Sequence, residues 1–131
     1  MPWTTPTDRT AGYVVTATDW NAGGQDDLSF LYGDTGWTTV TTFTNSWTAS
    51  PPAQYILIGR VVYLRGSITG GTAGTSAFTL PAAYRPTSAV NFTCVTGTAG
   101  TPNTVTVGTT GNVVPTTSTN TGLSNISFPI V

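Results

Sequence analysis

Short runs of apolar residues, often alternating with polar ones, fill the chain from Asp34 onward and are separated by Gly, Pro, Asn and Ser. Alternation with a period of two is typical of strands that bury one face. Many short strands separated in this way predict a mainly β protein, an antiparallel β-sandwich or jelly roll. The strand-like runs are 37–43, 54–58, 61–68, 78–81, 89–96, 104–107 and 124–130, and 112–115 is expected to be a looser segment.

The clearest hairpin joins 54–58 to 61–68 through a turn at Gly59-Arg60. In its second arm, alternation predicts a core face that consists of Val62, Leu64 and Ile68. The opposite face is expected to carry Tyr63, Arg65 and Ser67.

The run 37–43 is rich in the β-branched and aromatic residues that strands prefer. It follows a turn at 34–36. Alternation predicts that Val40 lies on one face and that the other face carries Trp37, Thr39, Thr41 and Phe43.

The first 33 residues are expected to form a segment for assembly or anchoring, followed by a β-sandwich domain at 34–131. Pro2 and Pro6 disfavour a helix at the start, so an extended arm is predicted there. One short helix is predicted from Thr18 to Gly33, because threonine caps helix starts and glycine suits helix ends.

The Gly23-Gly24 pair costs this helix about 1 kcal/mol per residue relative to alanine, so its stability is expected to depend on a partner surface. The apolar side chains of the segment then contact neighbouring subunits, or they pack on the chain's own domain. The candidate assembly residues are Trp3, Tyr13, Trp20, Leu28, Phe30 and Leu31.

The chain lacks most of the residue types that active sites commonly use. The chain has no His, Lys or Glu, and its charged side chains are five aspartates and four arginines. A Ser-His-Asp triad, a Cys–His pair and a zinc site of the usual type are therefore excluded. We expect no enzymatic activity, no catalytic residues, no metal ligands and no cofactor. Threonine makes up nearly a quarter of the residues, so hydroxyls and amides are expected to solvate the surface.

The same composition excludes several partners. Four scattered arginines and no lysine do not make the clustered positive charge that nucleic acids require. No apolar run approaches the ~18 residues of a membrane helix, and the start has no basic leader or apolar stretch typical of a signal peptide. Cys94 is the single cysteine, and its strand-like surroundings predict a buried structural thiol.

Aromatic residues are the remaining candidates for binding. Flat rings suit the apolar faces of sugars, so a glycan-stacking platform is one interpretation; the other is that the rings form the core or subunit contacts. The candidate glycan contacts are Trp37, Trp47, Tyr55, Tyr63 and Tyr84.

Several stretches resemble virion surface proteins of tailed bacteriophages. The run 15–21, followed by 27–31, is similar to the N-terminal region of many such proteins. The runs 60–66 and 79–86, together with 124–128, resemble the β-structured heads of phage tail fibres. The resemblance implies a protein that is made in the host cytoplasm without a signal peptide and displayed on the virion surface, commonly as a homotrimer.

The resemblance leaves two roles open, and a third interpretation lies outside it. The predicted helix and sandwich are almost contiguous, without the shaft of a tail fibre, which favours a capsid decoration or head-spike protein bound to capsid proteins. The alternative is a tail-fibre or receptor-binding tip that is bound to phage tail proteins and recognises host-surface glycans. A third interpretation is a free carbohydrate-binding or adhesin-like module from a bacterium.

Overall fold

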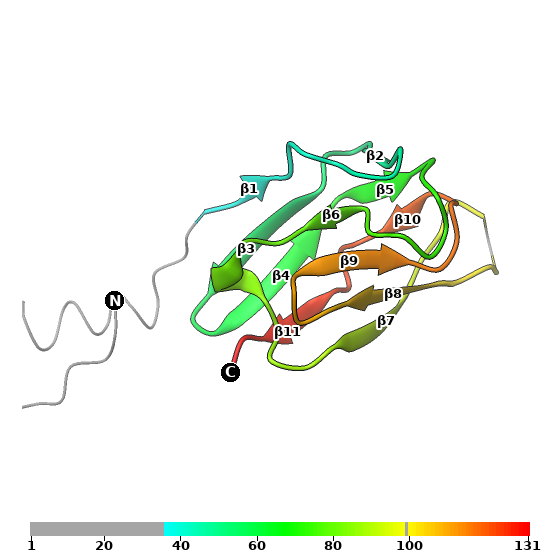
Figure 1. Ribbon diagram of the computed structural model, residues 1–131. Coiled ribbons are helices and arrows are strands. Elements are labelled where there is room, and N and C mark those ends of the chain that lie inside the picture. Colours follow the sequence, from blue (N-terminus) through cyan, green and yellow to red (C-terminus); the bar gives the residue numbers. More distant parts are fainter. Residues whose placement is uncertain (1–35, 99) are drawn as a thin grey trace, which may run out of the picture.

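The computed structural model describes residues 36–98 and 100–131, and short antiparallel strands dominate this part of the chain (Figure 1). The predicted mainly β fold is confirmed. The predicted arm and helix at 1–33, with all six candidate assembly residues, lie outside the described residues. Within the described ranges, no helix is long and apolar enough to cross a membrane.

The first sheet has four antiparallel strands in the order β1-β3-β4-β11. Its centre is the predicted hairpin, in which Ile56 pairs with Tyr63 and Leu57 pairs with Val62. The strands are β1 (Thr38–Thr39), β3 (Gln54–Ile58), β4 (Val61–Arg65) and β11 (Ser127–Pro129).

Two further sheets complete the domain. A small sheet has the order β10-β5-β2, from β10 (Thr121–Gly122), β5 (Ser67–Thr69) and β2 (Thr48–Ala49). The third sheet has the order β6-β9-β8-β7, from β6 (Phe78–Thr79), β9 (Asn112–Pro115), β8 (Asn103–Val107) and β7 (Val90–Cys94). A 3-10 turn, η2 (Ala82–Tyr84), follows β6.

The core lies between the third sheet and the other two, which Figure 1 shows as front and rear layers. Phe128 of β11 lies 6.4 Å from Phe92 of β7 between ring centroids. The fully buried side chains come from both layers, and they include Val62, Leu64, Ile68, Phe78, Val105, Val107, Val113 and Phe128. Burial of these alternating positions is the main stabilising term of the fold.

The hairpin register confirms most of the predicted faces. Val62 and Leu64 are buried, whereas Tyr63 and Arg65 are exposed. The prediction for Ser67 is wrong, because Gly66 adopts a φ of +94° and divides the run into β4 and β5. Ser67 is consequently buried, and its hydroxyl donates to the Ser50 carbonyl at 2.6 Å.

The run 37–43 forms a shorter strand than the sequence predicts. β1 ends at Thr39, and the Val40 amide donates instead to the Ala53 carbonyl at 2.9 Å. Both Val40 and Phe43 pack against the core, and the Phe43 and Phe78 rings meet edge to face at 6.0 Å. The prediction that these two side chains lie on opposite faces of one strand is wrong, because the strand ends before Val40 and the alternation of faces ends with it.

The segment 112–115, expected to be loose, is strand β9 at the centre of the third sheet. Val113 pairs with Phe78 on one side and with Val107 on the other. Pro115 lacks an amide hydrogen, but its carbonyl accepts from the Gly74 amide at 2.8 Å. The strand is only four residues long, which is too short for its polar and apolar residues to form a clear alternating pattern.

Candidate binding surfaces

The predicted aromatic platform does not exist as one surface, and Trp47 is the clearest correction. Its side chain is 2% exposed and belongs to the core cluster. Gly71 lies directly against the indole, since a Cβ there would come within 2.1 Å of two ring atoms. The indole nitrogen donates to the Thr75 hydroxyl at 3.4 Å. Trp47 therefore offers no ring face to a glycan, and its role is to fill the core.

Tyr55 and Tyr84 are brought together, with ring centroids 4.8 Å apart and planes at 69°. Burial raises the pKa of Tyr55, and the neighbouring Tyr84 raises it further. Tyr55 lines a cleft of about 150 Å³, whose other walls are Thr39, Val40, Thr41, Thr42, Thr79 and Pro81. Tyr63 lies on the opposite face of the sheet, because it pairs with Ile56 whereas Tyr55 pairs with Leu64.

The face of the first sheet that points away from the core is partly apolar, and we call it the outer face. By strand register it carries Thr39, Gln54, Ile56, Ile58, Val61, Tyr63, Arg65, Ser127 and Pro129. Ile56 is 3% exposed although it is outside the core cluster, whereas Ile58 is 43% and Tyr63 is 40% exposed. Exposed apolar residues gathered in this way often mark an interaction surface.

Trp37 extends the outer face through a polar and aromatic network. The Arg65 guanidinium lies 4.0 Å from the centroid of the Trp37 ring, within the range of a cation–π contact. Its Nε donates to the Gln54 side-chain oxygen at 2.6 Å, and the Gln54 amide donates to the Thr39 hydroxyl at 2.8 Å. Sequence reasoning named Trp37 and Arg65 separately, but only the register of β1, β3 and β4 brings them together.

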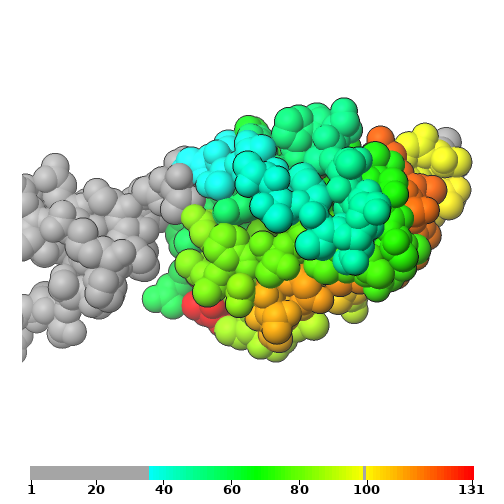
Figure 2. All heavy atoms as spheres, turned by 45° about the horizontal axis from the view of Figure 1, so that its top comes forward, coloured from blue at the N-terminus to red at the C-terminus, as the bar shows by residue number. Residues whose placement is uncertain are grey.

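Three loops gather at the end of the domain opposite to Gly36 and the C-terminus (Figure 1), and we call this the threonine end. Its segments are 70–76, 95–102 without the undescribed Ala99, and 116–121. The Gly70 amide donates to the Ser118 carbonyl at 3.1 Å, and the Gly97 amide donates to the Asn120 carbonyl at 3.0 Å. Figure 2 shows residues near 100, in yellow, protruding at this end.

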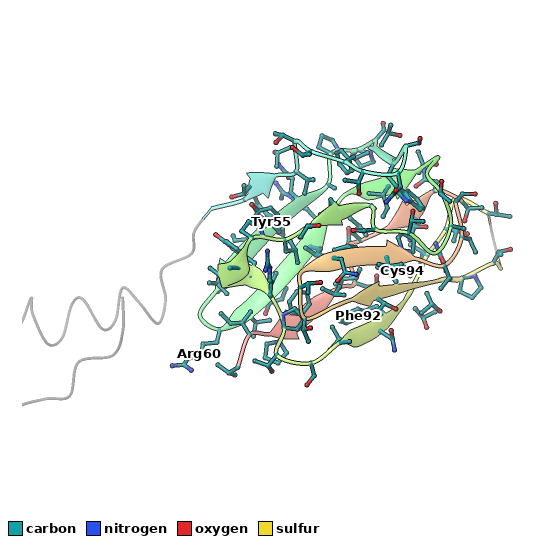
Figure 3. All side chains as sticks on the ribbon, viewed as in Figure 1. Tyr55, Arg60, Phe92 and Cys94 are labelled. Atoms are coloured by element: carbon teal, nitrogen blue, oxygen red, sulfur yellow. The ribbon has the colours of Figure 1, made fainter. Side chains whose placement is uncertain are left out.

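The threonine end has no charged side chain. From Gly66 to Val131 the sequence contains one charged residue, Arg85, whose Nε donates to the Leu80 carbonyl at 2.9 Å. Figure 3 shows Arg60 extending outward at the other end of the domain, away from Cys94. Hydroxyls, amides and backbone groups therefore supply the polar chemistry of these loops.

The end of β7 and the loop between β7 and β8 line an open pocket of about 340 Å³ at this end. Its lining is more apolar than polar and consists of Thr93, Cys94, Val95, Thr96, Thr98, Gly100, Thr101 and Pro102. Cys94 is 1% exposed, which confirms the predicted buried thiol, whereas Val95 is 74% exposed. Sequence reasoning missed this pocket, because threonine-rich loops carry no distinctive binding motif.

The Cys94 thiol is expected to resist modification in the folded protein. Burial raises its pKa from 9.0 to about 11, which lowers the thiolate fraction near neutral pH about a hundredfold. Reaction with Ellman's reagent is expected to be at least about a hundredfold slower before unfolding in guanidinium chloride than after it. Because the pKa of the thiol is raised in the folded state, the neutral thiol contributes to the stability of the fold. This contribution is complete below pH 9.0 and is lost as the pH rises toward about 11. Rapid labelling of the native protein would contradict this placement of the thiol.

The fold has a counterpart among solved structures. The chain is similar to the crystal structure of the receptor binding protein (gp15) of Listeria phage PSA, with a TM-score of 0.64 and 22% sequence identity. This likeness establishes the fold. The match covers 90% of this chain and 89% of that chain, so the two have similar lengths. No family model and no curated protein matches the sequence.

Proposed function

We propose that this chain is a non-enzymatic receptor-binding protein on the surface of a phage particle, and that it attaches to host-surface glycans. The observation that carries the proposal is the fold likeness to a phage receptor binding protein over nearly the whole of both chains. Because one fold can host many functions, the proposal also rests on the chemistry of its surfaces.

The length match bears on the choice between decoration and attachment. The near contiguity of the predicted helix and the β-sandwich favours a capsid decoration protein when the sequence is taken alone. The phage receptor binding protein, however, is matched over 89% of its chain by this short chain. This fold likeness supports receptor binding, and we favour that role over decoration.

The threonine end is the surface that we assign to the receptor. It lies opposite to Gly36, where the described chain begins, and is therefore the end farthest from the N-terminal segment's point of attachment. Its hydroxyls and amides both donate and accept hydrogen bonds, as sugar hydroxyls do. Having no charged side chain of its own, this end favours neutral glycans over charged ones.

The outer face is the surface that we assign to self-association. It presents Trp37, Ile58 and Tyr63, which are three of the five large apolar residues exposed in the described ranges. A homotrimer built through this face would cover them and leave the threonine end free. Six N-terminal residues remain predicted assembly contacts: Trp3, Tyr13, Trp20, Leu28, Phe30 and Leu31.

Replacing Ile58 with glutamate is expected to convert the homotrimer into a monomer, because a charge would be buried against an apolar neighbour. Ile58 is 43% exposed within one chain, so folding of the monomer is expected to survive. Sedimentation velocity gives the mass of each species. Thr109→Glu is the matched control, since Thr109 is exposed and lies in the turn after β8. An unchanged trimer in the Ile58→Glu variant would exclude the outer face as the interface.

Cell binding tests the receptor role. The full chain, fused to a fluorescent protein, is incubated with a panel of bacterial strains that includes Listeria. We expect saturable binding to some strains, and loss of that binding after periodate oxidation of surface sugars. A chain that binds no strain, or whose binding survives periodate, would refute glycan recognition.

A further inference from the structure

The pocket between β7 and β8 has a rim whose shape is fixed from within. The Thr96 hydroxyl lies 2.9 Å from the Thr98 carbonyl and 2.5 Å from the Thr101 carbonyl, and it accepts from the Thr98 amide at 3.2 Å. The Thr101 amide donates to the Thr98 carbonyl at 3.3 Å. These bonds close the loop on itself, so a ligand would meet polar groups already held in place.

Three other threonines line the pocket, and their hydroxyls are not used to hold the loop closed. Among the described residues, the side chains of Thr93, Thr98 and Thr101 make no hydrogen bond, although all three line the pocket. Each hydroxyl can donate one hydrogen bond and accept two. These three hydroxyls are therefore not engaged within the part of the chain that the structure describes, and they remain available to a ligand.

The remaining walls are apolar. Val95 is 74% exposed beside the opening and is backed by Gly122, where a Cβ would lie 3.0 Å from the Val95 side chain. Pro102 adds further apolar surface, whereas Cys94 is 1% exposed and contributes almost none. None of the eight lining residues is charged, so a phosphate, carboxylate or ammonium group would find no partner of opposite charge there.

Size limits the ligand as well. A volume of about 340 Å³ lies at the lower end of the range for small-molecule sites, roughly 300–1,000 Å³. The pocket is suited to a single sugar unit of a polymer. Its hydroxyls can orient the sugar, and its apolar walls favour burial of an apolar group.

We propose that this pocket binds one neutral sugar residue that carries a methyl or acetyl substituent. The substituent packs against Val95 and Pro102, while sugar hydroxyls bond to Thr93, Thr98 and Thr101. This inference rests on the proposed receptor-binding function and names the class of sugar that the function requires.

Two matched pairs of sugars test the proposal on the full chain labelled with ¹⁵N. L-rhamnose and L-mannose differ in a methyl against a hydroxymethyl group, and N-acetylglucosamine and glucose differ in the acetamido group. We expect the substituted member of at least one pair to shift amide resonances in 93–102, and to bind about fourfold more tightly than its parent. Equal affinities within both pairs would overturn the role of the substituent.

The variants Thr98→Val and Thr101→Val remove one hydroxyl each at nearly constant volume. Each is expected to weaken sugar binding about fivefold, which corresponds to the loss of one hydrogen bond. Thr109→Val is the control, because that exposed threonine lies outside the pocket, and it is expected to leave affinity unchanged. Unchanged affinity in both pocket variants would overturn the proposal.

Comparison of the sugar titrations with the cell-binding experiment separates failure of the pocket from failure of the function. If the chain binds cells but none of the four sugars shifts resonances in 93–102, the pocket assignment is wrong and the receptor role stands. If a substituted sugar shifts these resonances but no cells bind, the pocket assignment stands and the receptor role is wrong.

Discussion

Replacing Gly66 with alanine is expected to prevent the β-sandwich from folding. Gly66 has a φ of +94°, and a Cβ there would lie 2.0 Å from the Pro52 carbonyl oxygen and 2.9 Å from the Ala53 Cα. Both neighbours are backbone atoms and cannot rotate away, so β3 and β4 would have to separate at their ends. We expect a loss of at least about 4 kcal/mol in the free energy of unfolding.

Denaturant unfolding followed by tryptophan fluorescence measures this effect, and soluble yield serves where the variant does not fold. Gly74→Ala is the matched control: Gly74 also has a positive φ, +73°, but a Cβ there would meet nothing within 4 Å. Backbone strain alone is therefore expected to cost the control about 1–2 kcal/mol. Equal losses in the two variants would show that the contact with Pro52 carries no special cost.

Replacing Asn103 with aspartate is expected to be the second most damaging change. The Asn103 side chain is 1% exposed, and its amide nitrogen donates to the Thr121 hydroxyl at 2.7 Å and to the Thr117 carbonyl at 3.3 Å. Its oxygen accepts from the Thr116 hydroxyl at 2.7 Å and from the Thr117 amide at 3.1 Å. This one amide therefore ties β8 to the loop 116–121 of the threonine end.

A carboxylate at this position would keep the acceptor but replace the donor with a negative charge facing the Thr117 carbonyl. We expect a loss of about 3 kcal/mol at neutral pH, because a buried charge is left without a partner. The loss is expected to shrink near pH 4, where protonation restores a donor. Thermal unfolding at both pH values measures the difference.

Asn91→Asp is the matched control for this substitution. Asn91 is exposed on β7, and its side-chain oxygen accepts from the Thr106 hydroxyl at 2.6 Å, a bond that a carboxylate retains. We expect this control to change stability by less than about 0.5 kcal/mol. Receptor binding is expected to fall in the Asn103 variant alone, because of these two asparagines only Asn103 bonds to the loop 116–121. Equal effects of the two substitutions would contradict the assigned role of Asn103.

The sequence predicted the parts of the fold that local alternation determines. The hairpin at Gln54–Arg65, the strand around Cys94 and the buried thiol were all accessible, because each depends on residues two positions apart. The predictions failed where a backbone conformation interrupted the pattern. Gly66 turned Ser67 inward, and the hydrogen bond from Val40 to Ala53 ended β1 early. Neither the conformation of Gly66 nor the early end of β1 can be recognised from the alternation of polar and apolar residues.

The binding surfaces were less predictable because they depend on contacts between distant segments. Aromatic residues were the natural candidates for glycan contact, yet Gly71 lies against Trp47 in the core, and Tyr55 and Tyr63 lie on opposite faces of one sheet. Composition did predict a surface of hydroxyls and amides. It gave no indication that these groups would gather in the loops at one end, which is set by the pairing of β5, β7 and β8 with their neighbours.

The copy number of this protein in purified virions, measured by quantitative mass spectrometry against the major shell protein, tests the central claim most directly. Receptor binding predicts a number of copies that is a small fraction of the shell subunit count, as expected for a protein at an attachment apparatus. A copy number comparable to that of the shell protein would contradict this role and identify the chain as a capsid decoration protein.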